Sequence, residues 1–134
     1  MMKRVLLALL VAALWVAPAH ALFGRTQPLY NVEQAPIVTG SGKAPSLEEV
    51  GRTIRQAAVA REWTVHEQAP GHLVAVITPR QHMAKVDIRY TTTSYSITYN
   101  DSRELKYDGK EIHRNYNKWI KLLEQDINQA MTRH

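Results

Sequence analysis

Two stretches in the middle of the chain alternate strictly between apolar and polar residues. The apolar positions are Ala84, Val86, Ile88 and Tyr90 in residues 83–91, and Tyr95, Ile97 and Tyr99 in residues 94–100. The residues between them are charged or hydroxylated. Alternation with a period of two predicts two antiparallel strands that share one buried face and one face in water.

The same side chains predict how the two strands pair. If Tyr90 lies opposite Tyr95, each apolar residue of one strand meets an apolar residue of the other, whereas a shift by one residue would place isoleucine opposite serine. The other pairs that we expect are Ile88 with Ile97, Val86 with Tyr99, Leu73 with Ile88, and Ala75 with Val86.

Two further strands are predicted before this pair. Residues 63–67 and 72–78 are rich in β-branched residues and flank Pro70-Gly71, a dipeptide that marks a tight turn. The four segments follow one another directly along the chain. We therefore expect a four-stranded antiparallel meander.

A helix is expected on each side of the meander. Ser46 and Glu49 form a capping-box pattern, and the apolar spacing that follows predicts a helix ending near Arg61. A second helix follows the turn at Asp108-Gly109. Its apolar stripe is Ile112, Tyr116, Trp119, Ile120, Leu123, Ile127, Ala130 and Met131. The predicted fold is α+β, with both helices packed on the apolar face of the meander.

The first 21 residues have the layout of a secretory signal peptide. Lys3 and Arg4 precede an apolar run from Val5 to Ala17, and Ala19-His20-Ala21 supplies small residues for cleavage. The run is shorter than the roughly 20 residues that span a bilayer. We expect cleavage after Ala21, no permanent membrane anchor afterwards, and a periplasmic or secreted protein.

The rest of the chain divides into a lead and one domain. Residues 22–45 contain several glycines and prolines and little apolar periodicity, which predicts a flexible lead. A short edge strand is possible at Leu29 to Val32, since Pro36 is compatible only with an edge. Residues 46–134 form a single predicted domain.

Composition excludes several classes of chemistry. The chain has no cysteine, so disulfides, thiolate metal sites and thiol catalysis are excluded. The formal charge of +5 falls to +3 without Lys3 and Arg4, because 15 Lys and Arg then face 12 Asp and Glu. A modest charge of this kind, together with the export signal, argues against binding to nucleic acid.

The water-facing side of the meander is the first candidate binding surface. Its polar residues are Lys85, Asp87, Arg89, Ser96 and Thr98. Val74 and Val76 fall on the same side, which suggests partial cover by the lead or by a partner. The alternative is a face that is simply solvated.

A second candidate site lies where the sheet passes into the last helix. Tyr107, Asp108, His113 and Asn117 are close in sequence, and Asp108 precedes the helix, where a carboxylate is favourable. These residues could form a small polar site. Alternatively, His113 caps the helix or links it to the last strand by a hydrogen bond.

The histidines of the sheet form the third and weakest candidate. His66 and His72 are expected on the same face of neighbouring strands, where they could bind Zn²⁺ or Cu²⁺ with Asp87 as a third ligand. His82 lies in a loop and need not approach them. The alternative is that all three histidines are solvated, and no cofactor is predicted.

The C-terminal half resembles a family of small, uncharacterised exported proteins and lipoproteins of proteobacteria. The matching residues are Tyr95, Ile97 and Tyr99; Ser102, Leu105 and Tyr107; and Ile112, His113, Tyr116, Asn117 and Trp119. The resemblance extends more loosely over residues 46–134, although this chain lacks the cysteine of a lipoprotein. It implies export and this fold, and it assigns no activity.

Two functions remain open from the sequence. The first is an exported, non-catalytic envelope protein that binds a protein or glycan partner through the open sheet face. The second is a small hydrolase or metal-binding protein that uses His113 with Asp108, or His66 with His72. The second requires those side chains to converge on a pocket.

Overall fold

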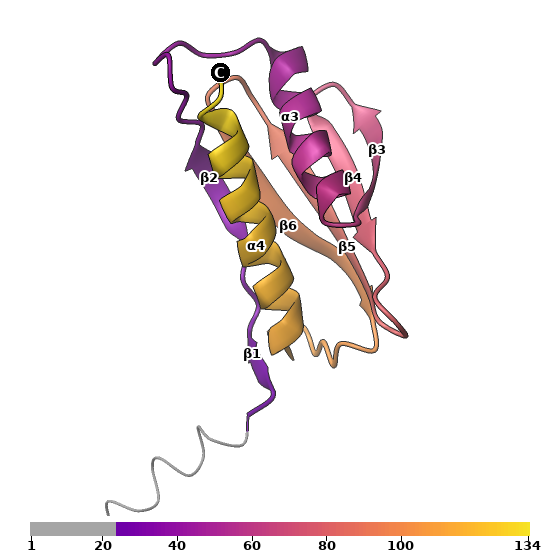
Figure 1. Ribbon diagram of the computed structural model, residues 1–134. Coiled ribbons are helices and arrows are strands. Elements are labelled where there is room, and N and C mark those ends of the chain that lie inside the picture. Colours follow the sequence, from indigo (N-terminus) through magenta and orange to yellow (C-terminus); the bar gives the residue numbers. More distant parts are fainter. Residues whose placement is uncertain (1–23) are drawn as a thin grey trace, which may run out of the picture.

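The computed structural model describes residues 24–134, so the predicted signal peptide lies outside the described part of the chain. The strands are β1 (Thr26–Pro28), β2 (Val32–Pro36), β3 (Thr64–Ala69), β4 (His72–Ile77), β5 (Met83–Tyr90), β6 (Ser94–Arg103) and β7 (Glu111–His113). The helices are α3 (Leu47–Ala60) and α4 (Arg114–Met131). Figure 1 shows both helices lying across one face of the sheet, which confirms the α+β class.

The main sheet has five strands, in the order β2-β6-β5-β4-β3, and β1 pairs with β7 in a separate two-stranded sheet. The predicted meander corresponds to β3–β6, so the expected count of four strands was wrong. The additional strand, β2, is hidden in the sequence because its alternation is broken. Its register against β6 shifts between Val32 and Ala35, and Gln34 has a φ of 53°.

Residues 26–28 and 32–36, within the segment expected to be a flexible lead, form strands of the two sheets. Val32 pairs with Ile97 and is only 3% exposed, so it is part of the core. Pro36 ends β2 at the outer edge of the sheet, where a missing N–H leaves no ladder bond unmade. The observed edge strand begins at Val32, whereas the strand predicted from the sequence ran from Leu29 to Val32.

Helix α3 begins and ends with recognisable caps. The Ser46 hydroxyl accepts a hydrogen bond from the Glu49 amide at 3.1 Å, which confirms the capping box. At the other end the amides of Glu62 and Trp63 donate to the carbonyls of Val59 and Ala58. This is a Schellman motif, in which Glu62 has a φ of 71°, a conformation more often taken by glycine.

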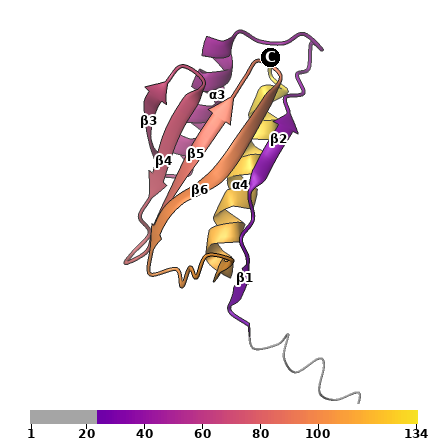
Figure 2. The ribbon, with the colours of Figure 1, turned by 180° about the vertical axis from the view of Figure 1, so that it is seen from behind.

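The pairing of the strands confirms the predicted register. Tyr90 lies opposite Tyr95, Ile88 opposite Ile97, and Leu73 opposite Ile88. Ile88 and Ile97 are fully buried beneath the helices. Figure 2 shows the opposite face of the sheet, which neither helix crosses. The sheet is therefore two-sided, with one apolar face covered and one polar face open.

Helix α4 closes the core over β6 and beside α3. Its buried side chains recur at helical spacing, and they are Tyr116, Asn117, Ile120, Leu123, Ile127 and Met131. Ile112, which the sequence places on the same stripe, lies instead in β7 and is also buried. The predicted apolar stripe therefore faces the core. The stripe begins at Ile112, two residues before the helix begins at Arg114.

Candidate functional site

The side of the main sheet that neither helix covers, called the open face from here on, carries all of the predicted polar residues. They are Lys85, Asp87 and Arg89 of β5, and Ser96 and Thr98 of β6. Asp87 pairs with Thr98, and Arg89 pairs with Ser96, so four of these residues form two rows across the sheet, while Lys85 pairs with Asp101. Val74 continues the row of Asp87 and is only 4% exposed.

A hydrogen-bonded network occupies the middle of the open face. His72 Nε2 lies 2.7 Å from Oδ1 of Asp87, and the Asn100 side-chain amide donates a hydrogen bond to Oδ2 of Asp87 at 2.9 Å. Burial acts to raise the pKa of Asp87, but the hydrogen bonds from His72 and Asn100 and the charge of Arg89 outweigh it and lower the pKa. Asp87 is therefore an ionised acceptor at neutral pH, and His72 donates to it.

Sequence reasoning missed Asn100 as a partner of Asp87. Strict alternation would have ended the pairing at Tyr99, but the register between β5 and β6 shifts between Lys85 and Val86. Asn100 is the extra residue at this bulge, and the bulge turns its amide towards the open face. A bulge at this position does not alter the alternation of apolar residues, so that alternation cannot predict it.

The two sheet histidines do not form the predicted metal site. His66 lies opposite Val74, whereas His72 lies opposite Arg89 and is bound to Asp87. They occupy different rows of the open face. Among residues 24–134, no group of three or more histidine, cysteine or acidic side chains could hold a metal ion.

The predicted polar site before α4 is not assembled either. Asp108 accepts hydrogen bonds from the backbone amides of Lys110 and Glu111, at 2.9 and 2.7 Å, and so closes its own turn. These amides lower the pKa of Asp108. The Tyr107 ring packs on Tyr99, with 4.2 Å between ring centroids.

The other two members of that prediction have structural roles. His113 is the N-cap of α4: its Nδ1 accepts from the Asn115 amide at 3.1 Å, and its own amide donates to Leu105. Asn117 is 3% exposed and is bonded to the segment around β1. The capping alternative given for His113 is therefore the arrangement observed, and no hydrogen bond joins His113 to Asp108 in the described chain.

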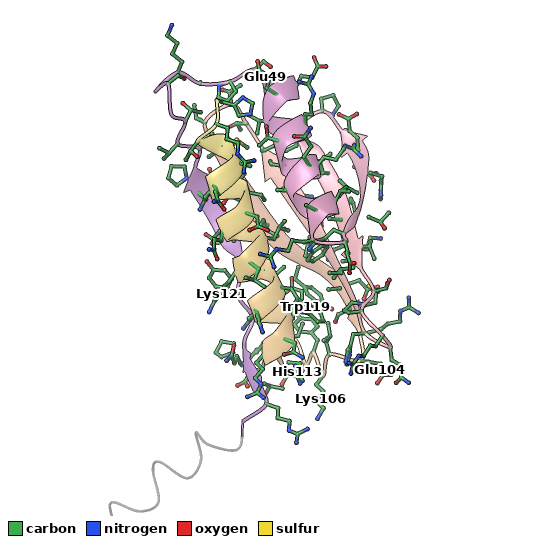
Figure 3. All side chains as sticks on the ribbon, in the orientation of Figure 1. Glu49, Glu104, Lys106, His113, Trp119 and Lys121 are labelled. Carbon is green, nitrogen blue, oxygen red and sulfur yellow. The ribbon has the colours of Figure 1, made fainter. Side chains whose placement is uncertain are left out.

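The imidazole of His113 instead lies next to that of His82, a neighbour that the sequence analysis did not predict. The two imidazoles are stacked with 6.5 Å between centroids, and His82 lies 6.4 Å from the Trp119 ring. Figure 3 shows His113 and Trp119 along the first turns of α4, with Glu104 and Lys106 in the loop below. We call His82, His113 and Trp119 the histidine end.

The hydrogen bonds fix the tautomers of the two histidines. His82 Nδ1 lies 2.8 Å from the Glu104 carbonyl, which can only accept, so this nitrogen carries the hydrogen and Nε2 is an acceptor. His113 Nδ1 accepts from a backbone amide, so its Nε2 carries the hydrogen. The pair thus presents one acceptor and one donor. A neutral His113 has no free basic nitrogen, which weakens its case as a general base.

The loops on both sides of the histidine end are conformationally unusual. Arg80, Glu104 and Lys106 all have left-handed backbone conformations, with φ of 57°, 58° and 56°. Such residues are strained unless the surrounding structure holds them, and they gather at ligand sites more often than elsewhere. The sequence did not predict these left-handed conformations, because none of the three residues is glycine or asparagine.

The capping role of His113 predicts a dependence of stability on pH. Burial is the main factor that lowers its pKa, followed by the positive charges of Arg114, His82, Lys106 and Arg25. The unfolded chain therefore takes up a proton below about pH 6.5, while the folded chain resists it. The free energy of unfolding should fall as the pH drops below this value and level off below the folded pKa.

The contribution of His113 can be isolated with a variant that keeps the cap. His113→Asn retains a good N-cap residue and cannot titrate. Urea unfolding of both proteins between neutral and mildly acidic pH should show a steeper loss for the original chain. Identical pH profiles for the two proteins would show that His113 does not titrate differently on folding.

Two buried tyrosines should respond to hydroxyl removal with opposite signs. The Tyr95 hydroxyl donates to Asn128 at 2.6 Å, so Tyr95→Phe should cost about 1 kcal/mol. The Tyr116 hydroxyl is buried without a partner in the described chain, so Tyr116→Phe should be neutral or stabilise by up to about 1 kcal/mol. Thermal unfolding of the two variants checks the contrast. A clear loss in Tyr116→Phe would reveal an ordered water on that hydroxyl.

Comparison with known proteins gives no match: no family model, no curated protein and no solved structure is significantly similar to the chain. Neither helix within residues 24–134 combines the length and apolar character needed to cross a membrane. The function must therefore be argued from the surfaces described above.

Proposed function

We propose that the chain is an exported, non-catalytic module of the bacterial cell envelope, and that its open face binds a partner protein. The observation that supports the proposal best is the two-sided sheet. Both helices and the buried core lie on one side, and the other side carries polar and charged residues, among which Asp87 is held in place by His72 and Asn100. Fixed polar groups lose little entropy when they bind, which favours recognition.

The shape of the open face favours a protein over a small ligand. Small ligands bind in concave sites, and four hollows of the described chain are lined by none of the polar residues of this face. Val74 is covered and Val76 is half-buried, so the accessible surface of this face is mainly polar, as is the rim of many protein contact surfaces. A glycan partner is the competing outcome.

The proposal of export rests on the sequence. The basic residues, apolar run and small residues within positions 1–21 have the order of a secretory signal, and the C-terminal half resembles exported proteins of proteobacteria. A fold without cysteine must be held together by its core alone, and the buried residues of the sheet and helices form one continuous core.

Site-specific photocrosslinking in cells that make the protein tests the proposal. A photoreactive residue at Arg89, exposed on the open face, should give a discrete protein adduct. The matched control is Gln56, which is also exposed but lies on α3. An adduct at Arg89 that disappears in His72→Ala would support binding through the network.

Three results would count against the proposal. These are no adduct at Arg89, equal adducts at Arg89 and Gln56, and an adduct that contains glycan without protein. Export itself is tested by fractionation and by the N-terminal residue of the purified protein, which should be Leu22. A chain that keeps Met1 and stays in the cytoplasm would refute this part of the proposal.

A further inference from the structure

A groove of about 480 Å³ runs beside the N-terminal half of α4, on the side that faces β1. It lies away from the open face, so it is separate from the surface proposed above. Its lining residues are Gln27 from β1, and Arg114, Asn115, Asn117, Lys118, Lys121 and Leu122 from α4. Lys121 is labelled in Figure 3 on this side of the helix.

The groove is positively charged and has no acidic lining residue. Arg114, Lys118 and Lys121 are exposed, and none of them forms a salt bridge in the described chain. Lys121 contacts the Tyr30 ring instead, at 5.1 Å from its centroid. The Glu124 carboxylate, which accepts a hydrogen bond from the Tyr30 hydroxyl at 2.6 Å, is close by but is not part of the groove lining.

The positions of these cations are unfavourable for the helix itself. Arg114 and Lys118 are one turn apart, so their charges repel one another. Arg114 also lies in the first turn, at the positive end of the helix dipole, and that turn contains no acidic residue to offset its charge. Helix stability alone therefore does not account for this arrangement, whereas an anion held in the groove would.

The polar groups of the groove are fixed so that they offer donors. Asn117 uses its amide fully within the protein, because its oxygen accepts from the Tyr30 amide and its nitrogen donates to Gln27 and Pro28. The Gln27 oxygen is thereby occupied, which leaves the Gln27 NH₂ group free to donate. Together with one guanidinium and two ammonium groups, it forms a set of donors that suits the oxygens of a phosphate.

We propose that this groove binds a phosphate group, carried by a small phosphorylated molecule or by the headgroup of an anionic phospholipid. Arg114 would bind two oxygens through its planar guanidinium, and Lys118 and Lys121 would add positive charge along the helix. Gln27 would complete the site from β1. The site is independent of the open face, and its occupant needs no contact with that face.

Titration with inorganic phosphate, followed by NMR of backbone and side-chain amides, tests the site. Chloride replaces phosphate at constant ionic strength as the reference. We expect saturable shifts at the Gln27 and Asn115 side-chain amides and at the backbone of Arg114 and Lys118. The variant Lys118→Glu/Lys121→Glu should weaken binding by at least about tenfold, the factor that corresponds to about 1.4 kcal/mol.

The matched control reverses two charges elsewhere. Lys43 and Arg133 are exposed and lie outside the groove lining, so Lys43→Glu/Arg133→Glu changes the net charge equally without touching the groove. This control should bind phosphate as the original chain does. Shifts that do not saturate, or an equal loss in both variants, would show only a general response to charge and would overturn the proposal.

Cosedimentation with vesicles separates the two sources of phosphate. Vesicles of phosphatidylglycerol, compared with phosphatidylcholine, should retain the protein in a phosphate-sensitive manner if a lipid headgroup is the ligand. Binding of free phosphate without binding to either vesicle identifies a small phosphorylated molecule. Retention on phosphatidylglycerol that is unchanged in Lys118→Glu/Lys121→Glu would contradict a role for the groove.

Discussion

Replacing Ile97 with alanine is expected to lower the free energy of unfolding by about 2–5 kcal/mol. Ile97 is fully buried in the central part of the sheet, between Ile88 on β5 and Val32 on β2. Its removal leaves a cavity that the strands on both sides cannot close without losing their pairing. Denaturant unfolding monitored by circular dichroism measures the loss.

The next residue along the same strand supplies the control. Thr98 points to the open face, so Thr98→Ala should change the free energy of unfolding by less than about 1 kcal/mol. The contrast between adjacent residues tests the two-sided sheet on which the proposed function depends. Similar losses for both variants would mean that the open face is covered in solution, for example by a second copy of the chain.

Replacing Asn117 with alanine is the second substitution with a large expected effect, a loss of about 2–3 kcal/mol. Asn117 is buried on α4, and its amide oxygen accepts from the Tyr30 amide at 3.0 Å. Its nitrogen donates to the Pro28 carbonyl at 2.9 Å and to Gln27 at 3.1 Å. Alanine would leave the Tyr30 amide, the Pro28 carbonyl and the Gln27 side-chain oxygen without this partner and release the segment that carries β1 and β2.

Limited proteolysis should show this release directly. Cleavage within residues 24–36 should accelerate in Asn117→Ala, while the rest of the domain stays protected. Asn115→Ala is the matched control, because no side-chain hydrogen bond of Asn115 is found in the described chain and its loss should cost less than about 0.5 kcal/mol. Unchanged proteolysis in Asn117→Ala would show that other contacts suffice to hold the segment.

The parts of the fold that follow from local patterns could be predicted from the sequence. Alternation in β5 and β6 determined which face is buried and, through pairs such as Tyr90 and Tyr95, the register. The capping box located the start of α3. These features depend on residues close together in the chain, and each has a distinct physical signature.

The missed elements depend on contacts between distant residues. β2 is stabilised by pairing with β6, some 60 positions further along the chain, and its own sequence carries a proline and a broken alternation. The contact of His82 with His113 joins a loop to the end of β7, and no sequence pattern connects the two. Asp87 was assigned to the correct face, but its partner Asn100 depends on a bulge, which apolar periodicity does not record.

The attachment of β1 and β2 has a consequence for the order of folding. Tyr30 is tied to Asn117 and Glu124, which are 87 and 94 residues later, so the segment before β2 cannot complete its docking until the last helix has formed. Contacts of such high sequence separation form slowly. During synthesis or translocation, before α4 has formed, the pairing of β2 with β6 would lack this attachment, and the edge of β6 would be open to other chains. A chaperone that shields this edge would raise the yield of native protein.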